Sequence, residues 1–178
     1  IGSPTDNASR FINNILQPVI KRIKSFIPDS YALSQVLEIT QFPQECIIFT
    51  ADVVNLYTSI VIPDGLVQLK RALRLCGFSE SYIEYLLDLT HWVLTNNFIQ
   101  FGDSIFLQKS GTAMGTSLAV VFANIYLAML ELDCFDLCNL NSLYKPPLLY
   151  KRFVDDMAVL FLDKISADIF ALNYNNLR

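Results

Sequence analysis

Apolar residues recur three and four positions apart along several stretches of the chain, which is the spacing of helices with one buried face. In the N-terminal part this spacing predicts a helix from about Asp6 to Phe26, with Pro18 as a kink, and a shorter helix from Ser30 to Leu37. Pro63 suits the first turn of another helix, and Gly77 suits its end.

Two further helices are expected later in the chain. One runs from Ser81 to about Leu94, and there Ser81 and Glu84 have the spacing of a capping box. The other covers Ala167 to Arg178 and simply stops at the last residue. The first residue is Ile1 rather than Met, and no signal peptide is expected. Both ends are expected to be those of a fragment of a longer protein.

The uncharged segment from Ser110 to Leu130 is compatible with two structures. Its length and its Gly111-x-x-x-Gly115 pattern would suit a helix that spans a membrane. However, its first third is small and polar, its strongly apolar part is too short to cross a bilayer, and Asn124 interrupts that part. The pattern therefore favours a glycine turn followed by a buried core helix from Leu118 to Leu130, with no membrane partner.

Short apolar runs predict strands in three places. The run from Cys46 to Asp52 is typical of a buried strand that ends in a carboxylate. FIQF and SIFLQ flank Gly102-Asp103, which is a strong signal for a two-residue hairpin turn. The run from Tyr150 to Phe161 predicts a second hairpin, with Asp155 and Asp156 between its apolar halves.

Composition indicates one globular domain. The 178 residues suffice for a core, and 53% hydrophobic against 17% charged residues excludes a disordered tail. The net charge of −4 gives no sign of a polyanion partner. Four cysteines and one histidine lack zinc-site spacing, and Cys134 and Cys138 are expected to be buried free thiols. We therefore expect an intracellular protein, in the nucleus or the cytoplasm.

The adjacent carboxylates of Asp155 and Asp156 need an explanation, because two like charges repel each other. One explanation is an acidic turn, since Asp is common in turns. The other is that Asp52, at the end of its strand, meets Asp155 at one sheet edge and forms a site for hard divalent cations. Two such ions about 3.5–4 Å apart would serve an in-line phosphoryl displacement, and their charge would let the carboxylates tolerate one another.

Three segments also carry known motifs in the expected order. FTADVVNLYTSI resembles motif A, QKSGTAMGTSLAVVFANIYLAMLE resembles motif B, and KRFVDDMAVLF resembles motif C of reverse transcriptases. IGSPT, FINNILQP and the later PDS resemble the stretch that follows the fingers strands in that family. Over almost its whole length the chain is similar to the reverse transcriptases of Penelope-like retroelements, relatives of the telomerase catalytic subunit.

This resemblance implies an α+β fold, a polymerase palm with an antiparallel sheet backed by helices (residues 45–178) after partial fingers and connecting helices (residues 1–44). It implies an RNA-directed DNA polymerase with Mg²⁺ as cofactor, Mn²⁺ being possible, and with an RNA template, a DNA primer and deoxynucleoside triphosphates as partners. The isolated chain is expected to be inactive. The alternative is a truncated or decayed fragment that is not catalytic.

The resemblance also assigns the metal and primer residues. Asp52 and Asp155 would hold the two metal ions, and the backbone carbonyl of Val53 would add a ligand. Asp156 would be a third catalytic carboxylate nearby, and Phe153 would support the primer end.

The nucleotide site is assigned in the same way. Tyr57 would lie beneath the sugar of the incoming nucleotide, although an aromatic beside apolar residues is, taken alone, more often part of a core. The residues that would shape the surface near the nucleotide and template are Gln108, Gly111, Met114 and Gly115. Val120 stands where the family usually has proline, and an apolar residue is expected to pack there.

Overall fold

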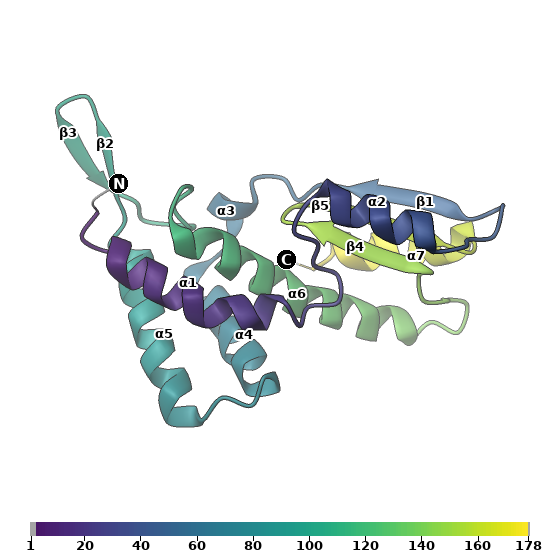
Figure 1. Ribbon diagram of the computed structural model, residues 1–178, viewed down its shortest axis with the longest axis horizontal. Coiled ribbons are helices and arrows are strands. Elements are labelled where there is room, and N and C mark those ends of the chain that lie inside the picture. Colours follow the sequence, from purple (N-terminus) through teal and green to yellow (C-terminus); the bar gives the residue numbers. More distant parts are fainter. Residues whose placement is uncertain (1–2, 178) are drawn as a thin grey trace. The chain divides into compact units, whose positions relative to one another are not determined.

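The computed structural model describes residues 3–177, which form helices and short antiparallel strands (Figure 1). They divide into two compact units, and each unit is assembled from two separate stretches of chain. The first contains the described residues up to Ile23 together with Asn55–Tyr126, and the second contains Lys24–Val54 together with the described residues from Leu127 onward. These units do not assign fingers or palm, so the predicted boundary at residue 45 stays a prediction.

The first unit is built mainly from helices. Its elements are α1 (Asp6–Ile20), α3 (Leu56–Ser59), α4 (Ile62–Leu75), α5 (Glu80–Thr95), β2 (Phe98–Phe101), β3 (Ser104–Leu107) and the first part of α6 (Ser117–Asn139). Helix α5 packs against both α1 and α4 (Figure 1). The predicted apolar faces meet in this core, where Leu16, Leu69 and Leu86 are fully buried.

The ends of two helices differ from the prediction. Helix α1 contains Pro18 but ends at Ile20, after which the N–H groups of Arg22 and Ile23 bond to carbonyls three residues back and tighten the last turn. Helix α5 begins at Glu80, after Ser79, so the predicted capping box is wrong. The carboxylate of Glu84 forms an ion pair with Lys70 of α4 instead.

The hairpin of β2 and β3 confirms the predicted two-residue turn. The strands pair from Phe98 with Leu107 to Phe101 with Ser104, and Gly102 adopts the required positive φ of 58°. All eight strand residues are exposed.

The second unit is a three-stranded antiparallel sheet with helices. Its elements are α2 (Ser30–Ile39), β1 (Ile47–Ala51), the rest of α6, β4 (Leu149–Phe153), β5 (Asp156–Phe161) and α7 (Lys164–Asn175). The strand order is β1-β5-β4, and α7 packs against β1 and β5. The prediction that β1 is buried is wrong, because β1 is an edge strand that packs on one face only, and Ile48 on its other face is 70% exposed.

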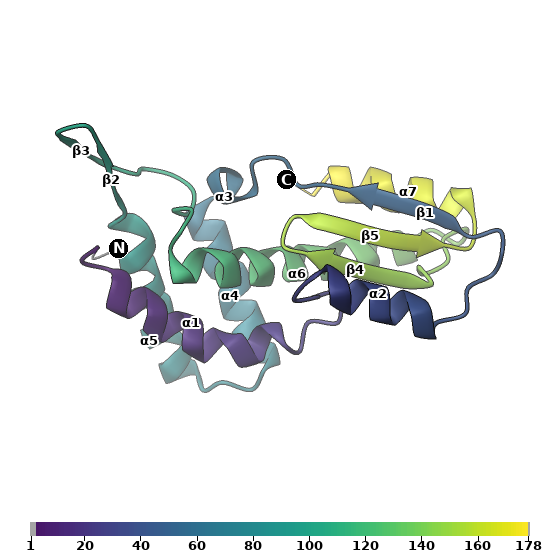
Figure 2. The same ribbon diagram turned by 45° about the horizontal axis from the view of Figure 1, so that its top comes forward.

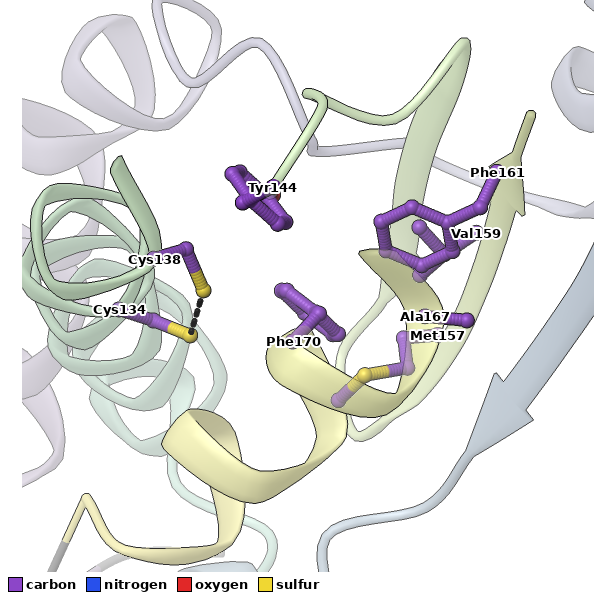
Figure 3. Close-up of a cluster of buried hydrophobic side chains, with 8 residues drawn as sticks. All are labelled: Cys134, Cys138, Tyr144, Met157, Val159, Phe161, Ala167 and Phe170. Atoms are coloured by element: carbon purple, nitrogen blue, oxygen red, sulfur yellow. Dashed lines mark hydrogen bonds between the residues drawn. The ribbon is translucent and has the colours of Figure 1, made fainter. Parts of the chain in front are cut away.

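The core of the second unit lies between the sheet, α7 and the second part of α6 (Figure 3). The ring of Phe170 is fully buried among other aromatic rings, including those of Phe49 and Phe161 at centroid distances of 5.9 and 5.5 Å. Cys134 and Cys138 are buried free thiols, as predicted. Burial raises the pKa of the Cys134 thiol, so it stays protonated and unreactive.

Helix α6 confirms the predicted core helix. Its length and composition would suit a membrane span, but 78% of its apolar window is buried inside the protein. Asn124, which interrupts the apolar run, is buried, and its side-chain amide donates to the Val120 carbonyl oxygen at 2.9 Å. A polar side chain satisfied within its own helix is compatible with a core position.

We predict that Phe170→Ala destabilises the β1-β5-β4 sheet by about 3–5 kcal/mol, because it removes the ring at the centre of this core. Hydrogen exchange of the β5 amides, which reports on this sheet, should accelerate at least about a hundredfold. Leu172→Ala on the same helix is the matched control, since Leu172 is 65% exposed and its loss should have little effect. Equal acceleration in both variants would contradict this account of the core.

Candidate active site

Three carboxylates gather at one end of the sheet. Strand β1 ends at Ala51, which pairs with Met157, so Asp52 and Asp156 lie one step beyond this pair. Asp155 directly precedes Asp156, in the turn between β4 and β5. The carbonyl oxygen of Asp155 accepts the N–H of Val53 at 3.3 Å. The end of β1 and the β4–β5 turn therefore lie side by side (Figure 2).

The carboxylate groups of Asp52, Asp155 and Asp156 have no hydrogen-bond or ion-pair partner among residues 3–177. Asp52 and Asp156 are exposed, and Asp155 is partly exposed. Carboxylate oxygens without partners are the ligands that hard divalent cations prefer, so the donor set fits Mg²⁺ or Mn²⁺. No group of three or more His, Cys, Asp or Glu in the described part of the chain could hold a metal ion on its own.

A groove of about 730 Å³ adjoins these carboxylates, on the face of the sheet that also carries α2. Its lining includes Asp52, Asp156, Phe153 and Lys151 from the sheet side and Leu33 from α2. Phe153 is 44% exposed there, next to Asp156 in the hairpin register. This position is compatible with contact to a bound primer, and the role of Phe153 stays a prediction.

The turn that carries Asp155 is strained. Val154 has a φ of +54°, a conformation that β-branched residues rarely adopt and that costs about 1–3 kcal/mol. Phe153 pairs with Asp156, so Val154 and Asp155 form a two-residue hairpin loop. A positive φ at the first central residue alone is the pattern of a type II′ turn, where glycine is usual. We call Val154–Asp155 the carboxylate turn.

A buried ion pair lies directly beneath this turn, and the sequence analysis missed it. Arg152 is fully buried and pairs with Glu131 of α6, which also accepts the Ser25 hydroxyl at 2.6 Å. The Arg152 Nη1 donates to the Val154 carbonyl oxygen at 2.6 Å. Burial, reinforced by the charge of Glu131, raises the pKa of Tyr150, so this hydroxyl stays protonated.

Two sequence signals could have shown that Arg152 and Glu131 each need a buried partner. Arg152 follows Tyr150 at the strand period of two, so its side chain is directed to the covered face of the sheet. Glu131 is the first charge after twenty-one uncharged residues, and a lone charge on a core helix calls for a partner.

In the first unit, the glycine turn packs directly against α3. Gly111 has a φ of +73°, and a Cβ on it would lie 2.6 Å from the Tyr57 carbonyl oxygen and 2.7 Å from the Thr58 Cα. The N–H of Thr112 donates to the same Tyr57 oxygen at 2.6 Å. Gly111 therefore lies against the protein's own backbone, and its role near a nucleotide stays a prediction.

The other predicted nucleotide residues also belong to the first unit. Met114 is 74% exposed, and Gly115 has a φ of +94° with open space around its Cα. Gln108 is half-buried, and its amide donates to the Ser110 carbonyl oxygen at 2.8 Å. Tyr57 is half-buried. Val120, which stands where the family usually has proline, is 46% exposed on α6.

Sequence comparison finds no relatives, since no family model and no curated protein matches the chain. Solved structures do match. Apo telomerase from Candida tropicalis, truncated from its C-terminal domain, superposes with a TM-score of 0.70 at 13% identity, over 92% of this chain and 36% of its own. Candida albicans telomerase with a fragment of telomeric RNA gives 0.65 at 15% identity, over 96% and 31%.

The fold is palm-like. The RNA-dependent RNA polymerase of bacteriophage phi12 matches as well, with a TM-score of 0.57 at 16% identity, over 92% of this chain and 27% of its own. The predicted α+β polymerase fold is thus confirmed, and the chain spans about a third of the length of the solved proteins that it resembles.

We predict that Gly111→Ala destabilises the first unit by at least about 1 kcal/mol more than Gly77→Ala does. Both substitutions place a Cβ at positive φ, but only the one at Gly111 also drives it into neighbouring backbone, since Gly77 has nothing within 4 Å. Urea unfolding followed by the fluorescence of Trp92, which lies in α5 of the same unit, measures the difference. Equal losses would mean that the turn can move away from α3 at little cost.

Proposed function

We propose that this chain is the palm of an RNA-directed DNA polymerase, a reverse transcriptase of a retroelement of the Penelope-like group. The observation that carries the proposal is the set of carboxylates at Asp52, Asp155 and Asp156, without partners, at one end of the sheet of a palm-like fold. Carboxylates that no described protein group neutralises are available to divalent cations, which in turn can hold the phosphates of a substrate.

The proposed reaction is nucleotidyl transfer. The 3′-hydroxyl of a primer gives its proton to solvent, and its oxygen bonds to the α-phosphorus of a deoxynucleoside triphosphate. The bond from that phosphorus to the bridging oxygen breaks, and pyrophosphate leaves. Asp52 and Asp155 would hold Mg²⁺ with help from the Val53 carbonyl and Asp156, and the bound metal would stabilise charge on the reacting oxygens. The chain's own part is to present these oxygens from strand ends held by the sheet.

The choice of RNA as template and DNA as product rests on the three motifs. Telomerase and the phi12 enzyme, which resemble this chain, support a nucleic-acid polymerase more generally. Tyr57 favours a DNA product, because a ring beneath the sugar would overlap with a 2′-hydroxyl. An RNA-dependent RNA polymerase is the second candidate, and the phi12 structure is the observation that favours it.

We predict that Asp155→Asn weakens Mn²⁺ binding to the 178-residue chain at least about tenfold, because it removes one charged ligand from the site. Electron paramagnetic resonance of free Mn²⁺ during a titration measures the affinity. Asp136→Asn is the matched control, since Asp136 is an exposed carboxylate on α6 in the same unit. Superimposable curves for the wild type and Asp155→Asn would refute the metal assignment.

For Tyr57 the expected effect is on sugar selection. In a polymerase that carries this domain and extends primers, Tyr57→Ala should raise ribonucleotide use relative to deoxynucleotide use by at least about tenfold, or 1.4 kcal/mol. Single-nucleotide extension with each substrate gives the ratio of the two kcat/KM values. Tyr57→Phe keeps the ring and should keep the selection. If Tyr57→Ala slows both substrates alike, Tyr57 belongs to the core and does not select the sugar.

A further inference from the structure

Arg152 is the largest side chain that is fully buried among the described residues, and it carries a charge. Burying a guanidinium is costly unless the protein supplies both a counter-charge and hydrogen-bond acceptors. Glu131 supplies the charge, and the Val154 carbonyl supplies an acceptor at 2.6 Å. The planar guanidinium therefore connects helix α6 to the carboxylate turn.

The backbone of Arg152 is fixed as well. Its N–H donates to the Ser25 carbonyl oxygen at 2.7 Å, and its own carbonyl oxygen accepts the N–H of Ile27 at 3.1 Å. The Ser25 hydroxyl meanwhile donates to Glu131. Residues 25–27, α6 and the hairpin are thus joined around one ion pair, so the guanidinium has little freedom to move away from the turn.

Stability alone does not require a charged pair at this place. A buried ion pair can often be replaced by apolar residues of similar volume without loss of stability. An apolar pair, however, could not donate to the Val154 carbonyl. Since Val154 holds an unfavourable φ of +54°, the turn needs a contact that opposes its relaxation, and the Arg152 hydrogen bond is such a contact.

A relaxation of the carboxylate turn would move the carbonyl group of Asp155. It accepts the N–H of Val53, the residue that follows Asp52, so a shift of the turn would separate the two carboxylates. We infer that the Arg152–Glu131 pair is a positioning device that holds the strained carboxylate turn and so sets the place of Asp155 against Asp52. This inference rests on the proposed function in that it takes these two residues as the metal ligands.

The test replaces both partners at once, in Glu131→Leu/Arg152→Met, so that no unpaired charge stays buried. Hydrogen exchange of the β5 amides should stay within about threefold of the wild type, because the core is kept. Mn²⁺ affinity, measured by paramagnetic resonance, should fall at least about fivefold. Lys164→Met/Asp168→Leu removes one exposed ion pair from α7 as the matched control and should change neither quantity.

Rescue separates positioning from a general loss of structure. Glycine adopts a positive φ without strain, so Val154→Gly added to the double variant should restore most of the lost Mn²⁺ affinity. If the double variant binds Mn²⁺ like the wild type, or if Val154→Gly restores nothing, the inference is wrong. Should the β5 amides lose protection in the double variant, the single variant Arg152→Lys is tested in its place. Lysine keeps the charge but lacks the planar fork that reaches both Glu131 and the Val154 carbonyl. Wild-type Mn²⁺ affinity in Arg152→Lys would then overturn the inference.

A second measurement keeps this inference apart from the proposed function. The exchange rate of the Val53 amide reports its bond to Asp155 with no metal present. In the double variant this amide should exchange at least about tenfold faster, relative to the β5 amides, than in the wild type. Faster Val53 exchange without any Mn²⁺ binding in the wild type would reject the proposed function and keep the positioning role. Unchanged Val53 exchange would reject the positioning role.

Discussion

The buried pair of Arg152 and Glu131 fixes which groups meet at one end of the sheet in the second unit. The guanidinium has its counter-charge in the Glu131 carboxylate and an acceptor in the Val154 carbonyl, and residues 25–27 bond to the Arg152 backbone. Segments more than a hundred residues apart are thereby tied to one point. The apolar core around Phe170 stabilises the sheet through burial, which does not depend on direction. The hydrogen bonds of the ion pair are directional, so they specify which groups meet at the end of the sheet.

The three carboxylates at that end of the sheet differ from Glu131 in having no protein partner among the described residues. Asp52, Asp155 and Asp156 have no partner in the described chain, although the nearest buried carboxylate, Glu131, is fully engaged. The protein thus neutralises the buried carboxylate of Glu131 and leaves the three carboxylates at the end of the sheet without a protein partner among the described residues.

Local patterns predicted much of this structure. Helical spacing located α4 and α5, and the Gly102-Asp103 turn located β2 and β3, because these signals lie within a few residues of one another. The pairing of Arg152 with Glu131 was not predicted, because only the tertiary fold brings these two residues together. The false capping box shows the same limit, since Glu84 satisfies its charge on a neighbouring helix. Packing on one face of β1 depends on its place at the sheet edge, which its own residues do not reveal.

The contact between Gly111 and the α3 backbone has a consequence for how relatives of this chain would diverge. A Cβ at this position would meet the carbonyl of Tyr57, so folding itself favours glycine here. The carboxylate of Asp155 forms no hydrogen bond or ion pair with the described residues, so folding places no such demand on it. Among relatives, conservation of the glycine would therefore record selection for folding, whereas conservation of the aspartate would record selection for something other than folding.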